Sequence, residues 1–217
     1  MMRVTFNCIL LVAALLSNGA AAAAEKLTAR ELVQRGSEEF FAGKVDQSIK
    51  SFEEAIALEP KAKAHLWQLG IAYYYAGRFA EGRDLFQLHQ TVNAHDVENA
   101  VWHFLCAARI DGPESARKKL IPITGDKRVP MSEVNALFLG SGSKEDVLKA
   151  AAEVKGDQDR RNALCYAHLY LGLYEEAHAN KEKSLEHIHK AAEEFSQKHY
   201  MGEVARVHAK LRAQKQN

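Results

Sequence analysis

The ten histidines are the residues of this chain best suited to hold a metal ion. A helix presents two ligands on one side when they are three or four residues apart, and no two histidines have that spacing. His187 and His189 are two residues apart, which separates them by about 200° around a helix. The histidines are therefore expected to be solvated or to face a partner, and neither a metal site nor another cofactor is predicted.

The segment Gly140-Ser141-Gly142-Ser143 is rich in glycine and serine, as loops that carry nucleophiles or bind phosphate are. It lacks the Gly-x-Ser-x-Gly spacing, has no expected strand before it, and is not followed by Gly-Lys-Ser/Thr. A tight turn between helices explains it. Carboxylates are numerous but scattered, as on a solvated helical surface. No catalytic residue is predicted, and the chain is expected not to be an enzyme.

The first 24 residues have the three parts of a secretory signal peptide. Arg3 supplies a positive charge, residues 4–16 are almost entirely apolar, and residues 20–24 offer small-residue cleavage sites. The apolar run is shorter than the roughly 20 residues of a membrane-spanning helix. Cys8 lies near the start of the run rather than after it, so lipidation is not expected. The mature chain should be secreted or periplasmic and lack a transmembrane segment; an uncleaved N-terminal anchor is the alternative.

The mature chain is electrically balanced, because the loss of Arg3 leaves 28 basic and 28 acidic residues. Proteins that bind nucleic acid usually carry a basic excess, so a nucleic-acid partner is not expected. Cys106 and Cys165 remain after cleavage. They could pair in an exported protein, or each could fill a small buried position on a helix.

The strongest pattern is self-similarity at a period of 34 residues. Gly36 and Gly70 have this separation, and so do Gly43 and Gly77. Such a period with these residue types marks tetratricopeptide repeats, each a pair of antiparallel helices. The first glycine of each unit is expected where the two helices approach most closely. The second is expected in the turn, where glycine most easily adopts a left-handed backbone.

Other residues take structural roles in the same pattern. Phe52 and Ala55 form a large and small pair on the second helix of the first unit, and Phe86 is equivalent to Phe52. Pro60 should end that helix, because it disfavours helix in the preceding residue and cannot donate a hydrogen bond. The expected structural repeat positions are Gly36, Gly70, Gly172, Ala55, Phe52, Phe86 and Pro60.

The sequence therefore predicts an all-α domain over residues 25–217, a solenoid of helical hairpins with about nine or ten helices. A loop is expected at 121–129, and Ser132 and Ser143 are placed to cap the helices that follow them. Regular repeats are expected at about 29–62, 63–96 and 165–198, divergent helices at about 97–155, and a capping helix at about 200–213.

The first helix of each unit should line a concave groove, and its groove-facing positions are unusually apolar. Aromatic side chains give large contact areas at low entropic cost, so they anchor interfaces. A fold-back of the C-terminal helix over these positions, or a dimer seam, is the alternative. The expected partner-binding residues, which we call the apolar row, are Phe40, Phe41, Trp67, Ile71, Tyr74, Tyr75, Tyr166, Leu169 and Leu173.

Over roughly residues 30–212 the chain resembles the lipoprotein NlpI-like group of tetratricopeptide proteins of bacterial envelopes. The resemblance rests on the regular repeats and on three segments, 101–105 (VWHFL), 134–140 (VNALFLG) and 170–172 (YLG). It implies an adaptor that brings a tail-specific protease and peptidoglycan hydrolases together, with a tendency to form homodimers. The chain departs from that group in lacking a lipidation cysteine after its signal.

The expected function is that of an exported scaffold or adaptor that binds other proteins or peptides. A structural subunit of a larger assembly is the alternative, and a hydrolase with an unrecognised site is a third class.

Overall fold

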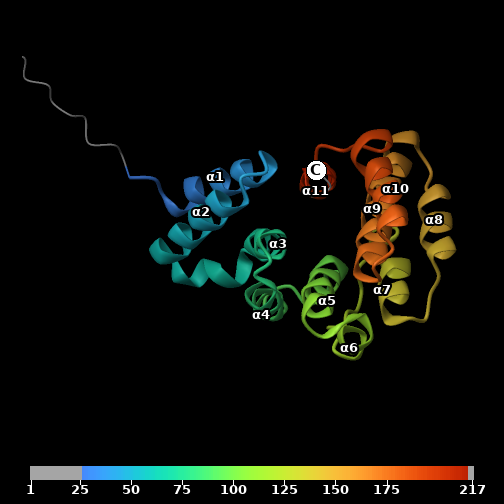
Figure 1. Ribbon diagram of the computed structural model, residues 1–217, viewed down its shortest axis with the longest axis horizontal. Helices are drawn as coiled ribbons and strands as arrows, with labels where there is room; N and C mark the ends of the chain where they lie inside the picture. The colour runs from blue at the N-terminus through green and yellow to red at the C-terminus, as the bar shows by residue number, and fades with distance from the viewer. Residues whose placement is uncertain (1–25, 215–217) are drawn as a thin grey trace, which may run out of the picture.

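The computed structural model describes residues 26–214, so the expected signal peptide, residues 1–24, lies outside the described part. Within that part the fold is all-α and contains no strand, with eleven α-helices where about nine or ten were expected (Figure 1). The first helices are α1 (Ala29–Phe41), α2 (Val45–Leu58), the 3-10 helix η1 (Pro60–His65), α3 (Trp67–Ala76) and α4 (Phe79–His89). The next are α5 (Val97–Asp111), α6 (Pro113–Lys118), α7 (Met131–Leu139) and α8 (Lys144–Ala152). The last are α9 (Asp157–Ala177), α10 (Lys181–His189), the π-helical turn η2 (Lys190–Glu194) and α11 (Tyr200–Gln214).

In three helical hairpins, α1–α2, α3–α4 and α9–α10, a glycine of the first helix lies where the two helices pack most closely. A Cβ on Gly36 would lie 3.0 Å from the ring of Phe52, and one on Gly70 would lie 2.6 Å from Phe86 Cζ. A Cβ on Gly172 would lie 2.7 Å from the side chain of Ile188. At Gly70 and Gly172 a Cβ would lie too close to its neighbour, as expected for positions that need the smallest residue, while at Gly36 the contact is at the limit of the tight range.

The turns of the hairpins have the expected backbone. Gly43 and Gly77 both have a φ of +79°, in the left-handed region that glycine adopts at low cost. Ala179 has the equivalent place in the α9–α10 turn and a φ of 63°, the one such value among non-glycine residues of the described chain. Helix α2 ends at Leu58, directly before the Glu59-Pro60 step.

The divergent middle agrees with the sequence in part. The hydroxyl of Ser143 accepts from the backbone N–H of Asp146, whose carboxylate accepts from the N–H of Ser143, so the predicted cap of α8 is confirmed. The predicted cap by Ser132 is wrong. Helix α7 already begins at Met131, after Pro130, and therefore Ser132 is an exposed residue of its first turn.

Helix α5 is the centre of the core, since every residue from Val97 to Ala108 is buried. Cys106 stands where the regular units have glycine, but here the glycine lies on the other helix. A Cβ on Gly82 of α4 would lie 2.8 Å from Cys106 Sγ. Cys106 and Cys165 are both free and buried, which decides between the two alternatives for the cysteines.

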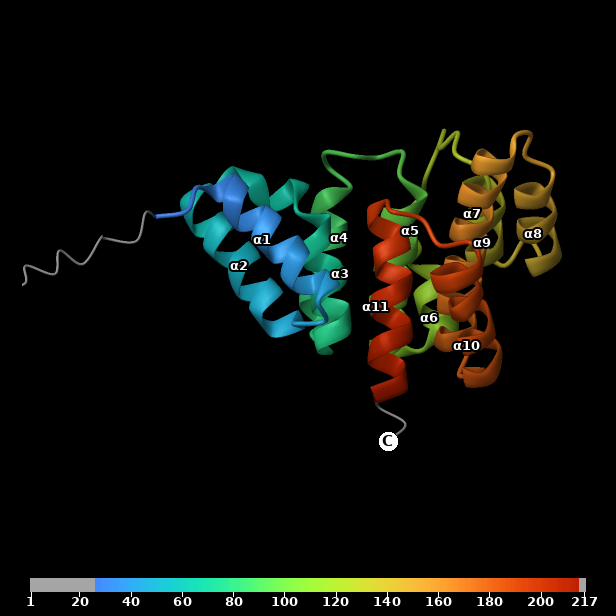
Figure 2. The same cartoon turned by 90° about the horizontal axis from the view of Figure 1, so that it is seen from above.

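Helix α11 lies between α1 and α3 on one side and α9 and α10 on the other, as both views show (Figures 1 and 2). One side of the helix is apolar and faces the core, since Met201, Val204 and Val207 are buried and Leu211 packs against the core. The helix therefore joins the first and last parts of the chain.

Candidate functional site: the covered apolar row and its cavity

The structure places the apolar row in the interior. Phe40, Ile71, Tyr74, Leu169 and Leu173 are at most 2% exposed. Tyr75 is also buried, while Phe41, Trp67 and Tyr166 are partly buried and pack against the same core. The expectation of an open groove is thus corrected: α11 folds back over the row, which was the alternative, because its own apolar stripe needs the same cover.

The first turn of α11 makes aromatic contacts with the row. The ring of Tyr200 lies 4.9 Å from that of Phe41 and 4.7 Å from that of Trp67, both edge to face. It also stacks parallel to Phe40 at 6.3 Å. Edge-to-face pairs at these separations are favourable beyond the area that they bury.

The later turns of α11 make polar contacts with the same row. The hydroxyl of Tyr75 lies 2.9 Å from His208 Nδ1. The hydroxyl of Tyr74 donates to Glu176 Oε2 at 2.9 Å, and Arg212 forms an ion pair with the same carboxylate. This end of the interface is therefore a buried hydrogen-bond network rather than an apolar seam.

His208 carries no charge in this environment at neutral pH. The side chain is fully buried, which lowers its pKa to about 4 by removing the imidazolium from water. The Glu176 carboxylate, 4.0 Å from Nε2, opposes this shift, and the Arg212 guanidinium adds to it. Protonation of His208 would therefore disfavour the seated position of α11.

A cavity of about 260 Å³ lies beside the aromatic end of α11. Its wall is formed by side chains from α3, α4, the first half of α5, the 119–130 loop, α9 and the start of α11. The aromatic members are Trp67, Phe86, Trp102, Tyr166 and Tyr200, and the polar members are His89, Asp96, Glu98, Asn99, Arg128 and His199.

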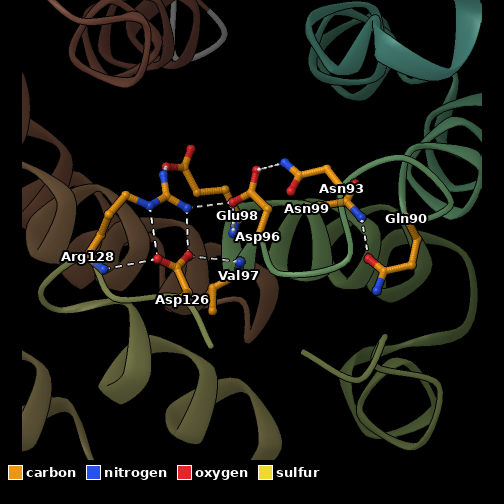
Figure 3. Close-up of polar contacts among 8 residues, drawn as sticks. All are labelled: Gln90, Asn93, Asp96, Val97, Glu98, Asn99, Asp126 and Arg128. Carbon is orange, nitrogen blue, oxygen red and sulfur yellow. Dashed lines mark hydrogen bonds and ion pairs between the residues drawn. The ribbon is translucent and has the colours of Figure 1, made fainter. Parts of the chain in front are cut away.

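One edge of the cavity is an acid–arginine cluster, which consists of Asp96, Glu98, Asp126 and Arg128 (Figure 3). The guanidinium of Arg128 pairs with Asp96 and Asp126 at 2.6 Å each and also with Glu98. Asp96 in addition caps α5, since its carboxylate accepts from the N–H of Glu98 at 3.0 Å. The cluster thus attaches the 119–130 loop to the first turn of α5.

The carboxyl groups of the cluster differ in proton affinity. Burial raises the pKa of Glu98 to about 7, because loss of hydration and repulsion by Asp96 outweigh the attraction of Arg128. Burial also tends to raise the pKa of Asp126. Hydrogen bonds from Arg128 and from the N–H of Val97 outweigh burial, so the pKa of Asp126 is lowered. Glu98 is therefore the member of the cluster that titrates near neutral pH.

The sequence predicted neither the cluster nor the burial of the histidines. His89, His103, His168 and His208 are at most 6% exposed, so the expectation that the histidines are solvated or face a partner is wrong for these four. The expectation that the carboxylates lie on a solvated surface is also wrong for Glu175, which is 1% exposed. Its carboxylate accepts hydrogen bonds from Lys144 and Asn180 at 2.7 Å each. One feature of the sequence could have indicated the cluster. Three polar residues, Asp96, Glu98 and Asn99, stand at the start of a helix that is otherwise apolar.

No set of three or more His, Cys, Asp and Glu side chains within residues 26–214 is arranged to bind a metal ion. Over the same residues, no helix combines the length and the apolar character needed to cross a membrane.

The chain matches no protein-family model, and a search of curated proteins finds no match to it.

Proposed function

We propose that this protein is an exported scaffold or adaptor of the tetratricopeptide type, which binds a helical segment of another polypeptide on the apolar row in place of α11. One observation carries the proposal: the row already holds an amphipathic helix, and it does so with both aromatic and polar contacts. Helix-in-groove binding uses such contacts. The glycine-closed hairpins and their 34-residue period support the repeat type.

The contacts of α11 describe the partner segment that would replace it. Tyr200 fills the aromatic end, His208 meets Tyr75 eight residues later, and Arg212 meets Glu176 four residues after that. A suitable partner helix therefore has an aromatic residue in its first turn and a basic residue about three turns later. Its basic residue would restore the charge partner of Glu176.

Because α11 must be displaced before a partner can bind, the seated helix lowers the apparent affinity of the row for a partner. When the binding-competent state is only a fraction of the molecules, the apparent dissociation constant rises by the inverse of that fraction. Variants that loosen α11 without altering the row should consequently bind the partner more tightly.

The experiment first identifies the partner by crosslinking in the native envelope and mass spectrometry, and then measures its affinity in purified form. Tyr200→Ala combined with His208→Ala removes contacts made by α11 and leaves every residue of the row in place. We expect this variant to bind the partner at least about tenfold more tightly, whereas Gln214→Ala, at the exposed end of α11, should not change the affinity. Unchanged or weaker binding by the double variant would remove the apolar row from the account.

Export rests on the N-terminal pattern of residues 1–24. N-terminal sequencing of the native protein should find a start between about Ala20 and Glu25 and no lipid. An intact Met1, or an acyl group on Cys8, would contradict export in this form.

A further inference from the structure

Five residues that line the cavity beside α11 carry a buried polar atom without a hydrogen-bond partner within the described chain: His89 Nε2, Asn99 Oδ1, Trp102 Nε1, His199 Nε2 and the Tyr200 hydroxyl. Of these residues, His89, Asn99 and Trp102 are 4%, 2% and 1% exposed. An unsatisfied buried polar group is costly, and here five of them belong to residues that line one cavity. The surroundings of the cavity thus include polar groups that the chain itself leaves unpaired.

Two of these atoms are hydrogen-bond acceptors. His89 Nδ1 lies 2.8 Å from the carbonyl oxygen of Ala64, so Nδ1 carries the proton and Nε2 accepts. The amide nitrogen of Asn99 donates to Gln90 Oε1 at 3.0 Å, which leaves Asn99 Oδ1 as an acceptor (Figure 3).

Trp102 Nε1 and His199 Nε2 are donors, because the N–H of Gly202 donates to His199 Nδ1, and the Tyr200 hydroxyl is both donor and acceptor. The unpaired atoms thus include acceptors and donors, and it is the charge of the cavity that favours one class of occupant.

The charge of the cavity is negative. Three carboxyl groups, Asp96, Glu98 and Asp126, share the guanidinium of Arg128, and Asp96 and Glu98 line the cavity directly. Arg128 donates to all three through Nε and both terminal nitrogens, so it is already committed to these carboxylates. The cluster therefore repels an anion and attracts a cation.

Aromatic rings form the remaining wall. Trp67 and Tyr200 meet edge to face at 4.7 Å, and Trp102 lies on the α5 side. Ring faces attract cations through their quadrupole, most strongly for tryptophan, and aromatic walls beside carboxylates suit ammonium groups.

We propose that this cavity is a binding site for a small organic cation, whose ammonium group lies beside Asp96 and Glu98 and whose carbon framework lies against Trp67, Trp102 and Tyr200. The volume of about 260 Å³ limits the ligand to a small molecule. The site does not depend on the exchange of α11 for a partner segment. Because Tyr200 belongs to α11, a ligand that binds here stabilises the seated helix.

The full mature chain reports on this site without a label, because its two tryptophans, Trp67 and Trp102, both line the cavity. We would titrate it with choline, which is charged at every pH, and with n-butylamine, and follow tryptophan fluorescence. Sodium butyrate and glucose are the matched anionic and neutral probes. A saturable change is expected with at least one of the two cations and with neither control.

The decisive variants remove charge and preserve shape. Glu98→Gln should weaken binding of the cation about tenfold or more, whereas Asp84→Asn, on the exposed face of α4, should leave it unchanged. Asp96→Asn, which keeps a helix-capping side chain, is the second test if Glu98→Gln does not fold. Choline should also bind more tightly as pH rises from 6 to 8, and the Glu98→Gln variant should lose this dependence.

Three results would overturn the assignment. The first is saturation by glucose or butyrate in place of the cations, and the second is no saturable change with either cation. The third is unaltered cation binding by a folded Glu98→Gln or Asp96→Asn variant. None of these results bears on whether a polypeptide binds the apolar row.

Discussion

Two buried regions of the molecule differ in their chemistry. The first is the set of glycine crossings, where Gly36, Gly70 and Gly172 lie against the second helix of their hairpins. The second is the surface between α11 and the apolar row. At the crossings, a backbone without a side chain lies directly on a ring or an aliphatic group, as Gly70 does on Phe86. Under α11, the contacts include the Tyr75–His208 hydrogen bond and the Arg212–Glu176 ion pair, with a cavity beside them.

Because of this difference, the stability of the two regions should respond to different changes. At a crossing the backbone and the facing side chain are in direct contact and neither is ionisable, so the crossing should respond to side-chain size and not to pH. The α11 surface contains a buried imidazole and a buried carboxylate network, so it should respond to pH. We therefore expect the hairpins to form the rigid frame and α11 to be the element whose position can be altered.

Gly70→Leu should have the largest effect. Even a Cβ at this position lies 2.6 Å from Phe86 Cζ, so a leucine must push α3 and α4 apart. Overpacking of this kind typically costs 1–3 kcal/mol, and direct contact with the crossing should bring the loss to at least about 3 kcal/mol of unfolding free energy. Chemical denaturation measures it.

Gly77→Ala is the matched control for the same hairpin. Nothing lies within 4 Å of a Cβ at Gly77, but its φ of +79° is unfavourable for alanine. The cost should be only about 1 kcal/mol, from the backbone alone. Equal losses at Gly70 and Gly77 would mean that the crossing is not close-packed.

Acid should weaken the α11 surface by an intermediate amount. The pKa of His208 is about 4 in the folded chain and 6.5 in its ordinary state, so between these values the unfolded chain binds the additional proton. The contribution of His208 to stability is therefore complete above about pH 6.5 and is lost as pH falls toward 4. The loss should be on the order of 3 kcal/mol, and denaturation of the wild type and of His208→Asn at a series of pH values measures it.

The comparison of variant with wild type isolates His208 from other groups. His103 and His168 also have pKa values of about 4 because of burial, and they remain in both proteins. Glu98 acts in the opposite sense, since its raised pKa contributes stability below about pH 4.5 that is lost as pH rises through 7. If the unfolding free energy of His208→Asn falls toward low pH as steeply as that of the wild type, the assigned role of His208 is contradicted.

The smallest effects are expected at the two serines outside both regions. Ser143→Ala removes the hydroxyl that caps α8 and should cost about 1 kcal/mol. Ser132→Ala should cost less than about 0.5 kcal/mol, because Ser132 is exposed and caps nothing. A larger loss at Ser132 than at Ser143 would show that the boundary of α7 is misplaced.

The sequence predicted the hairpins well because their determinants are local and periodic. Gly36 and Gly70 at the crossings, Gly43 and Gly77 in the turns and Ser143 at a cap each act within one or two neighbouring helices. Ser132 was misassigned because Pro130 and Met131 already begin the helix before it.

The sequence could not decide the position of α11 or reveal the cavity. An apolar stripe shows that a helix is buried but not what covers it, so Met201, Val204 and Val207 were compatible with several partners. The acid–arginine cluster joins the start of α5 to residues about 30 positions later in a loop without periodicity. Only the fold brings Arg128 to Asp96 and Glu98.

We infer that α11 is a separable cover over a rigid frame of hairpins. Native-state hydrogen exchange of the full mature chain, measured over a series of low denaturant concentrations, tests it most directly. We expect the amides of α11 to exchange through a partial opening that requires less free energy than the opening of α3 and α9. Exchange of α11 only through global unfolding, with the same free energy as α9, would contradict the claim.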